Sequence, residues 1–343
     1  MNDALRSLLE QVLDRRDLTE EQAGVLLQVL THADLPPALA GAFLAGLRCK
    51  GVVAAEVRGF AYAMRKLGRT PDFEAGLDAI DIVGTGGDAS GSLNLSTGAA
   101  LLTAACGLPV IKHGNRSISS RSGSADLIER LGLPMPLDES AARRYLEATG
   151  FTFLFAPYYH PAMKSLAPVR SALGIRTVFN LLGPLTNPGS PRFYLIGAFG
   201  EDAARLMAEA LSGMHIQRAW VVHGAQGWDE ATPIGPFKVF DVQAGQVSER
   251  VIDPLDYGLA RISPTALAGG DAIANLAALR AVFEGRDTGA HLDALSLQAG
   301  LALHIAGREP SIEAGIARAR TAVTSGVAAR WLQSLQQHTA VDS

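Results

Sequence analysis

The chain has 343 residues, of which 48% are hydrophobic and 19% charged, so it is long enough for one large domain or two unequal ones with a substantial core. Its formal net charge of −4 excludes the broad positive field that attracts nucleic acid or an anionic membrane surface. With two cysteines and no run of about eighteen apolar residues, we expect no disulfide framework, no membrane span and a cytoplasmic location.

The first seventy residues show helical patterns only. Thr19 followed by Gln22 is typical of a capping box, and apolar residues follow at helical spacing: Ala23, Leu26, Leu27 and Leu30. Further helices are predicted from Pro36 to Gly51 and from Ala54 to Lys66. These helices carry more apolar and small residues than their own core needs. We therefore expect residues 1–70 to form a helical domain that also packs against a second subunit.

From residue 71 onward, short β-rich runs alternate with helical patterns. The β-rich runs are Ala79–Val83, Val110–Lys112, Thr152–Phe155, Phe193–Gly197 and Ala219–His223. The helical patterns are Ser96–Cys106, Ser124–Leu131, Ser140–Thr149 and Ala203–Leu211, and helices return from Asp271 to the end. This alternation predicts an α/β domain over residues 71–343, with a mostly parallel central sheet.

A glycine-rich turn follows the first predicted strand, in the run Gly84-Thr85-Gly86-Gly87-Asp88. Its glycines let backbone N–H groups turn inward, which is a geometry that binds phosphate. The turn is not a P-loop, and it lacks the acid expected about twenty residues after a dinucleotide-binding turn. The next helix begins at Asn94-Leu95-Ser96-Thr97, and its free N–H groups and hydroxyls favour an anion. We therefore predict an anion site here rather than a tight turn without a ligand.

The segment from Lys112 to Ser124 contains three fixed cations, five serines and no acid, in a chain that is acidic overall. A solvated basic loop is the ordinary interpretation of such a run. However, this run directly follows an apolar strand and precedes a helix, where an open α/β sheet binds its ligands. Cations and serine hydroxyls together suit a doubly charged phosphate or a pyrophosphate.

These stretches together resemble the anthranilate phosphoribosyltransferase family: Gly84-Thr85-Gly86-Gly87-Asp88, Asn94-Leu95-Ser96-Thr97 and Lys112-His113-Gly114-Asn115-Arg116-Ser117. The resemblance continues through His160-Pro161-Ala162-Met163-Lys164, Pro168-Val169-Arg170, the run from Arg176 to Pro188, Asp229-Glu230, and Gly269-Gly270-Asp271 with Asn275. It covers essentially the whole chain. It implies a nucleoside phosphorylase/phosphoribosyltransferase-like fold and a homodimer. The implied reaction joins anthranilate to phosphoribosyl pyrophosphate, giving N-(5-phosphoribosyl)anthranilate and pyrophosphate in tryptophan biosynthesis.

The resemblance also implies a role for individual residues. The donor, phosphoribosyl pyrophosphate, would be bound by Gly84, Gly87, Asp88, Ser92, Asn94, Leu95, Ser96, Thr97, Lys112, His113, Gly114, Asn115, Arg116, Ser117, Ile118, Ser119, Ser120 and Ser124. Anthranilate would meet Gly84, Asn115 and Arg170, with the Arg170 guanidinium facing its carboxylate. Position 92 is serine where the family more often has threonine, a change that keeps the hydroxyl.

An adjacent pair of acids, Asp229 and Glu230, lies in a glycine-flanked loop after an apolar run. Such a pair is usually a solvated surface feature. Beside a pyrophosphate pocket it suits Mg²⁺, which binds one or two carboxylates together with water and substrate oxygens. The resemblance implies that Ser96, Asp229 and Glu230 carry Mg²⁺.

The catalytic residues proposed from the sequence are His113 and Arg170. His113 is either an acceptor of the amine proton or a positioning donor. His160 and Lys164 fit one helix face, and the segment from Asn180 to Pro188 is either a loop that orders the substrate entrance or a packing segment.

Two rival functions share this fold, a pyrimidine nucleoside phosphorylase and a nucleic-acid-binding relative. The phosphorylase's own phosphate-loop and base-binding signatures do not occur in this sequence, and the net charge of −4 disfavours nucleic acid.

Overall fold

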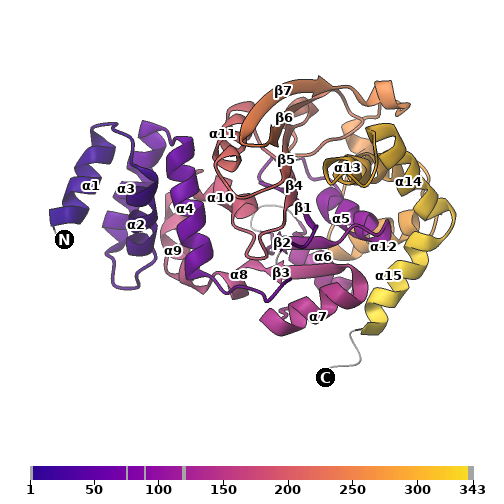
Figure 1. Cartoon of the computed structure of the whole chain (residues 1–343), viewed down its shortest axis with the longest axis horizontal. Helices are drawn as coiled ribbons and strands as arrows, with labels where there is room; N and C mark the ends of the chain where they lie inside the picture. Colours follow the sequence, from indigo (N-terminus) through magenta and orange to yellow (C-terminus); the bar gives the residue numbers. More distant parts are fainter. Residues whose placement is uncertain (1–2, 75, 89, 118–120, 339–343) are drawn as a thin grey trace.

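Two groups of elements stand side by side in the computed structural model, a set of helices at one end and an α/β unit beside it (Figure 1). The structure describes residues 3–74, 76–88, 90–117 and 121–338. Within these residues, no helix combines the length and the apolar character that crossing a membrane would require.

The N-terminal helices are α1 (Asp3–Leu13), α2 (Glu20–Leu30), α3 (Pro37–Lys50) and α4 (Ala54–Leu67). The predicted capping box at the start of α2 is confirmed, because Thr19 Oγ1 accepts from Gln22 N at 3.1 Å and Gln22 Oε1 accepts from Thr19 N at 2.9 Å. Helices α2 and α4 approach closely at Gly59, where a Cβ atom would lie 2.1 Å from the carbonyl oxygen of Glu20. Only glycine allows this approach.

The predicted sheet is confirmed and is larger than expected. In the described part of the chain it has seven strands in the order β3-β2-β1-β4-β5-β6-β7, with the first five parallel and the last two antiparallel. The strands are β1 (Ile80–Gly84), β2 (Val110–Gly114), β3 (Phe151–Phe155), β4 (Phe193–Gly197), β5 (Arg218–His223), β6 (Phe237–Gln243) and β7 (Gln246–Ile252).

The hairpin of β6 and β7 is absent from the sequence-based prediction. Its turn consists of Ala244 and Gly245, both with positive φ, which is the conformation of a tight hairpin turn. Strand β7 lies at the edge of the sheet and exposes most of its residues. It therefore has neither the apolar run of a buried strand nor a clean alternation, which are the signals used for the other strands.

Helices cover both faces of the sheet. The remaining α-helices are α5 (Leu95–Ala105), α6 (Ser124–Arg130), α7 (Glu139–Thr149), α8 (Ala156–Tyr159), α9 (Ala167–Leu173), α10 (Phe179–Leu185), α11 (Glu201–Ser212), α12 (Ala272–Phe283), α13 (Ala290–Ile305), α14 (Ile312–Thr324) and α15 (Val327–Gln337). One face, with Ile82 and Leu195, packs in a core that includes α5 and α13. The opposite face, with Tyr194 and Ile196, shares its core with α10, α11 and the N-terminal helices. Alternate residues of the same strand thus join different cores.

Of the two interpretations of the segment from Asn180 to Pro188, the structure supports packing for its first part, because helix α10 runs through Leu185 and most of its side chains are buried. One local expectation is wrong. His160 and Lys164 do not share one continuous α-helix, since α8 ends at Tyr159 and a 3-10 turn (Pro161–Ser165) follows. Proline at 161 cannot donate the backbone hydrogen bond that would extend α8.

Candidate active site

The site lies where the order of the strands reverses. Strand β1 pairs with β2 on one side and with β4 on the other, and Gly84 at its end lies opposite Gly197. The chain reaches β2 and β3 on one side before returning to β4 and β5 on the other. Loops leaving the carboxyl ends of the parallel strands diverge at such a point and leave a crevice that binds ligands in open α/β sheets.

The loop after β5 is fastened to the glycine turn after β1. Asp229 Oδ2 accepts from Gly86 N at 2.5 Å and from Thr85 Oγ1 at 3.4 Å, and Asp229 N donates to Asp88 Oδ2 at 3.3 Å. Two glycines make room for this contact. A Cβ atom on Gly84 would lie 2.5 Å from Asp229 Oδ2, and one on Gly197 would lie 1.5 Å from Asp229 O.

Three carboxylates gather at this contact, those of Asp88, Asp229 and Glu230. Burial and the charge of Asp88 raise the pKa of Asp229 to about 7, and burial and the charge of Asp229 raise the pKa of Glu230 well above its ordinary value. Glu230 Oε1 also accepts from Ser96 N at 3.2 Å, at the start of α5. The structure therefore brings together Ser96, Asp229 and Glu230, the three residues expected to hold a metal.

This arrangement fits Mg²⁺ better than a metal held by protein ligands alone. Among the described residues, no group of three or more histidine, cysteine, aspartate or glutamate side chains is arranged to hold a metal ion. Mg²⁺ usually keeps several waters and binds one or two carboxylates together with substrate phosphates. A cluster of carboxylates with raised pKa values gains stability when a divalent cation neutralises it.

The start of α5 is held on two sides. Asn94 Nδ2 donates to Ser122 O at 3.0 Å, and Asn94 Oδ1 accepts from Asn275 Nδ2 at 2.9 Å. Leu95 and Thr97 are buried, Ser96 is half-buried, and Ser92 forms an isolated bridge to Ala268. Within the glycine turn, Asp88 Oδ1 accepts from Ser90 N at 3.0 Å.

Lys112 lies inside the protein rather than at the surface of a phosphate pocket. Its side chain is 1% exposed, and its Nζ donates to Ile82 O at 2.5 Å. Nearby, Asn187 Nδ2 donates to Asp81 Oδ2 and to Ile111 O, both at 2.8 Å. Burial raises the pKa of Asp81 to about 6, although the Lys112 charge opposes this shift. This buried cluster stiffens β1 and β2 directly behind the glycine turn.

Asn187 and Asp81 support the site from behind, and the sequence analysis gave neither residue this part. Asp81 interrupts an apolar run that reads Ala79-Ile80-Asp81-Ile82-Val83. An acid in the middle of a buried strand requires a hydrogen-bond or charge partner, so Asp81 could have been recognised from the sequence as a buried polar group with a partner elsewhere in the chain.

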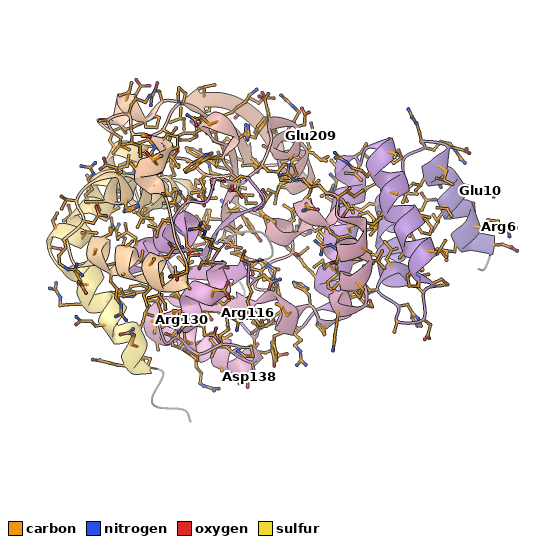
Figure 2. All side chains as sticks on the ribbon, turned by 180° about the vertical axis from the view of Figure 1, so that it is seen from behind. Arg6, Glu10, Arg116, Arg130, Asp138 and Glu209 are labelled. Atoms are coloured by element: carbon orange, nitrogen blue, oxygen red, sulfur yellow. The ribbon has the colours of Figure 1, made fainter. Side chains whose placement is uncertain are left out.

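The basic segment is partly neutralised by acids of α6. Arg116 Nη1 donates to Asp126 Oδ1 at 3.0 Å and to Glu129 Oε2 at 2.7 Å. Asp126 Oδ2 also accepts from Ser117 N at 3.2 Å and from Gly123 N at 2.8 Å, so one carboxylate binds two backbone N–H groups of the segment. Figure 2 shows Arg116 on the surface of the α/β unit, far from Arg6 and Glu10 on α1.

Other residues of this segment also have defined positions. Gly114 ends β2, where a Cβ atom would lie 2.3 Å from Ser124 Oγ, and Ser124 Oγ donates to Asn115 O at 3.2 Å. The predicted donor ligands Ile118, Ser119 and Ser120 lie outside the described residues.

His113 lies beside His160, with ring centroids 5.1 Å apart and the rings nearly perpendicular. His113 Nδ1 donates to Gly183 O at 3.2 Å, since a carbonyl oxygen only accepts, and His160 Nε2 donates to Thr186 O at 3.0 Å. Burial lowers the pKa of His113 to about 3 and that of His160 to about 4. Both rings are therefore neutral at pH 7, and Nε2 of His113 is a buried acceptor with no partner among the described residues.

Arg170 and Arg176 come from the chain between β3 and α10. The Arg170 guanidinium lies 5.2 Å from the centroid of the Phe179 ring, and among the described residues no carboxylate forms an ion pair with it. Arg176 was assigned no role from the sequence. It lies over the Phe199 ring at 4.1 Å and donates to Gly87 O, so it holds the glycine turn from a second direction.

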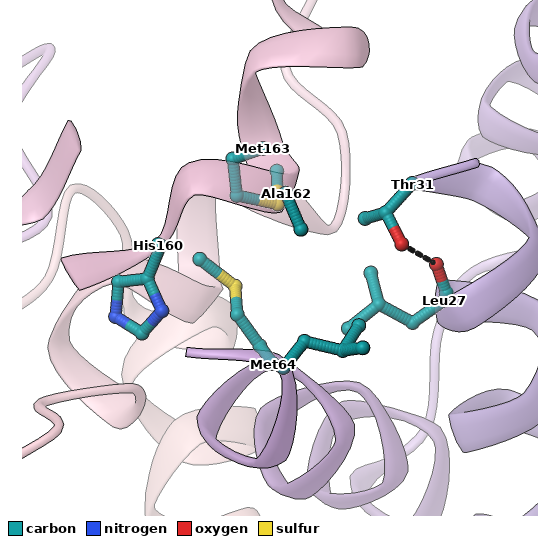
Figure 3. Close-up of a pocket in the computed structure, with 7 residues that line it drawn as sticks. Leu27, Thr31, Met64, His160, Ala162 and Met163 are labelled. Atoms are coloured by element: carbon teal, nitrogen blue, oxygen red, sulfur yellow. Dashed lines mark hydrogen bonds between the residues drawn. The ribbon is translucent and has the colours of Figure 1, made fainter. Parts of the chain in front are cut away.

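An apolar pocket lies between α2, α4 and the turn after α8 (Figure 3). It is lined by Leu27, Thr31, Met64, Leu67, His160, Ala162 and Met163. Apart from the neutral His160, no ionisable side chain is among these lining residues, which makes the pocket unsuited to a phosphate. Through His160 the pocket borders the histidine pair.

Two family models match this chain. The model described as the helical bundle domain of a glycosyl transferase family matches residues 6–68, and the model described as its a/b domain matches residues 76–329. The a/b-domain match covers more than half of the chain.

Curated relatives and solved structures match along nearly the whole chain. The anthranilate phosphoribosyltransferase of Rubrobacter xylanophilus is 44% identical over 94% of this chain and 94% of its own, and that of Azorhizobium caulinodans is 42% identical over 98% and 97%. The crystal structure of the Thermus thermophilus enzyme has a TM-score of 0.90 at 40% identity, covering 96% of this chain and 98% of that one. The Saccharomyces cerevisiae enzyme, in complex with PRPP and Mg, has a TM-score of 0.90 at 26% identity over 99% of both chains. This chain belongs to the anthranilate phosphoribosyltransferase family.

Proposed function

We propose that this chain transfers the phosphoribosyl group of phosphoribosyl pyrophosphate to the amine of anthranilate, releasing pyrophosphate, as a step of tryptophan biosynthesis. The observation that carries this proposal is that the glycine turn, the start of α5 and the pair of acids are joined at the carboxyl ends of the central strands. Asp229 binds the glycine turn, and Glu230 binds the start of α5. A phosphate-binding backbone and a pair of acids for a metal are thereby held in one frame.

We propose that the pyrophosphate and ribose of the donor bind along this frame. The donor ligands are Gly84, Gly87, Asp88, Ser92, Asn94, Leu95, Ser96, Thr97, His113, Gly114, Asn115, Arg116, Ser117, Ile118, Ser119, Ser120 and Ser124. Lys112 acts on the donor through its charge, because its Nζ is buried against Ile82 O. Arg116 must leave or share its contacts with Asp126 and Glu129 to reach a phosphate.

Ser96, Asp229 and Glu230 are the residues we propose to hold Mg²⁺. When bound with the donor, Mg²⁺ neutralises charge on the pyrophosphate as the bond to the ribose breaks. The chain's own part is to hold the two carboxylates together, although burial and mutual repulsion raise their pKa values. The hydrogen bonds from Gly86 N and Ser96 N offset part of that repulsion.

Anthranilate is proposed to meet Gly84, Asn115 and Arg170, with its carboxylate on the Arg170 guanidinium. Support comes from the absence of a carboxylate partner for Arg170 among the described residues, and from its place over the Phe179 ring. The Nε2 lone pair of His113 is neutral, buried and without a partner among the described residues, and we propose that it accepts the amine N–H and so orients the nucleophile. Its lowered pKa makes it a poor general base, so of the two roles considered, positioning is favoured.

The chemistry requires positioning more than acid–base catalysis. An aromatic amine is neutral at pH 7 and attacks without losing a proton first, while the ribose carbon becomes electron-poor as pyrophosphate leaves. Holding both reactants in line lowers the activation barrier by ~7 kcal/mol or more in favourable cases. The glycine turn and the two acids lie in loops, but hydrogen bonds tie them to each other and to the start of α5, as such positioning demands.

Anthranilate fluorescence tests the proposed activity. We expect the signal to fall only when the protein, phosphoribosyl pyrophosphate and Mg²⁺ are all present, and to persist when EDTA is added first. A signal that persists with both substrates saturating would contradict the proposed activity. In that case, phosphate-dependent cleavage of a nucleoside would be measured next.

We also propose that residues 1–70 form the dimerisation domain of a cytoplasmic homodimer, with residues 71–343 as the catalytic domain. Support comes from large apolar side chains exposed on the N-terminal helices, namely Leu13, Val25 and Leu67. Sedimentation at micromolar concentration tests this, and a monomer there would contradict it.

A further inference from the structure

A directed chain of hydrogen bonds runs from helix α12 to the start of α5. Gly270 N donates to Asn275 Oδ1 at 2.6 Å, and Asn275 Nδ2 donates to Asn94 Oδ1 at 2.9 Å. Asn94 Nδ2 then donates to Ser122 O at 3.0 Å. The first group is a backbone N–H, which only donates, and the last is a carbonyl oxygen, which only accepts. The two ends therefore determine which way both amides point.

The Gly270 end of this chain is itself firmly placed. Gly269 N donates to Gly91 O at 2.8 Å, and Leu93 N donates to Leu267 O at 2.9 Å, so the segment before α12 pairs with the segment before α5. A Cβ atom on Gly269 would lie 2.4 Å from Ser92 O, which shows how closely the two backbones approach. Asn275 is 2% exposed, and water therefore does not compete for its amide.

We propose that Asn275 is a positioning residue that fixes the orientation of the Asn94 amide for the donor. Asn94 Oδ1 already accepts from Asn275 and also from Ser122 Oγ at 3.2 Å. The nitrogen of Asn94 is consequently the group that can still donate to a phosphate oxygen. If the amide were reversed, it would present its oxygen to an anion and repel it. This inference rests on the proposed function, because it assumes that Asn94 binds phosphoribosyl pyrophosphate.

Two variants of Asn275 test the polarity of the chain. Asn275→Ala removes the link, and the isosteric Asn275→Asp still accepts from Gly270 N but places an acceptor opposite Asn94 Oδ1. We expect either variant to raise the KM for phosphoribosyl pyrophosphate and the Kd of pyrophosphate with Mg²⁺ by about tenfold, the cost of one hydrogen bond. The KM for anthranilate should stay within about twofold.

A double-mutant cycle separates positioning from a merely structural role. If Asn275 acts through Asn94, then Asn275→Ala should cost less than about twofold in pyrophosphate Kd when Asn94→Ala is already present. Asp271→Ala is the matched control. It removes the side chain that caps the same helix, accepting from Ile273 N and Ala274 N, but leaves the Asn275–Asn94 bond intact. We expect it to lower the melting temperature without changing either KM.

The outcomes have distinct meanings. An equal loss from Asn275→Ala with and without Asn94, or equal changes in both KM values, would overturn the role assigned to Asn275. Calorimetry with pyrophosphate and Mg²⁺ measures binding without turnover, and thermal denaturation identifies any variant that fails to fold. Should Asn275→Ala fail to fold, the isosteric Asn275→Asp carries the comparison. A native protein that does not consume anthranilate would instead contradict the proposed function.

Discussion

The carboxylate of Asp229 accepts a hydrogen bond from the backbone N–H of Gly86 at 2.5 Å, although the two residues are 143 positions apart in the sequence. This contact joins the acid-bearing loop after β5 to the glycine turn after β1. A metal bound by the acids and a phosphate bound by the turn would share one support, and such preorganisation lowers the activation barrier of phosphate chemistry.

Asp229→Asn separates the charge of this residue from its hydrogen bond. The amide oxygen still accepts from Gly86 N, but the anionic ligand is lost. We expect the Mg²⁺ concentration for half-maximal activity to rise roughly 10- to 100-fold. Titration of Mg²⁺ at saturating substrates measures this, and an unchanged requirement would exclude Asp229 as a metal ligand.

The same variant makes a prediction about stability. The pKa of Asp229 is raised from 3.8 to about 7 in the folded state, so stability falls as the pH rises from about 3.8 to 7, and the full cost of the charged form is present above pH 7. We therefore expect Asp229→Asn, in the absence of Mg²⁺, to be at least as stable as the native protein at pH 8. Urea denaturation at pH 8 measures this, and a clear destabilisation would contradict the electrostatic interpretation.

Gly197→Ala should displace the acid loop. The added Cβ atom would lie 1.5 Å from Asp229 O, a backbone atom that cannot move aside cheaply. We expect a loss of roughly 1–3 kcal/mol in the free energy of unfolding and a large fall in kcat. Gly200→Ala is the control, since no heavy atom lies within 4 Å of its added Cβ and its φ is extended. Equal effects of the two changes would contradict the steric explanation.

Arg170→Ala should affect one substrate only. A guanidinium–carboxylate pair contributes about 1.5–3 kcal/mol, so we expect the KM for anthranilate to rise roughly 10- to 100-fold. The KM for phosphoribosyl pyrophosphate should remain nearly unchanged. Steady-state kinetics with each substrate varied in turn decides the matter, and equal increases in both would remove Arg170 from the anthranilate site.

The pair of buried histidines lowers stability in mild acid, while the buried acids with raised pKa values, Asp81, Asp229 and Glu230, act in the opposite direction. The pKa of His113 is lowered to about 3 and that of His160 to about 4 in the folded state, against an ordinary value of 6.5. The unfolded chain therefore binds up to two more protons as the pH falls below 6.5 toward 4. Each proton lowers stability by about 1.4 kcal/mol per pH unit over that window. Urea denaturation from pH 7 to pH 4.5 measures the slope. The buried acids contribute alike in both proteins, so between pH 7 and pH 4.5 His160→Gln should lose less stability, or gain more, than the native protein. The same pH dependence in both proteins would contradict this assignment.

Asn187→Ala should destabilise the sheet behind the site. It removes the hydrogen bonds to Asp81 Oδ2 and to Ile111 O, and it leaves a buried carboxylate with fewer donors. We expect a loss of roughly 2–4 kcal/mol in the free energy of unfolding. Asn180→Ala, which removes a single half-buried bond from Thr177 N to Asn180 Oδ1, should cost only about 1 kcal/mol. Similar losses of unfolding free energy from both variants would show that the Asn187–Asp81 hydrogen bond stabilises the protein no more than an ordinary half-buried one.

Local patterns were enough to predict much of the fold. The capping box of Thr19 and Gln22 and the strand Phe193–Gly197 depend on residues close in sequence, and both are as expected. The glycine turn was also evident, because several glycines after an apolar strand have few structural uses other than binding or tight turning. The edge strand β7 was missed, since an exposed strand carries no apolar signal.

The sequence by itself determined the family resemblance, the residue types of the site and the elements other than the β6–β7 hairpin and the helices between β3 and β4. Only the tertiary structure decided that Lys112 is buried against Ile82 O, that Arg116 pairs with acids of α6, and that Asn275 donates to Asn94. The physical reason is sequence separation. Helix caps and turns are set by neighbours within a few positions, whereas the direction of a buried amide or the partner of a buried charge depends on residues that only folding brings together.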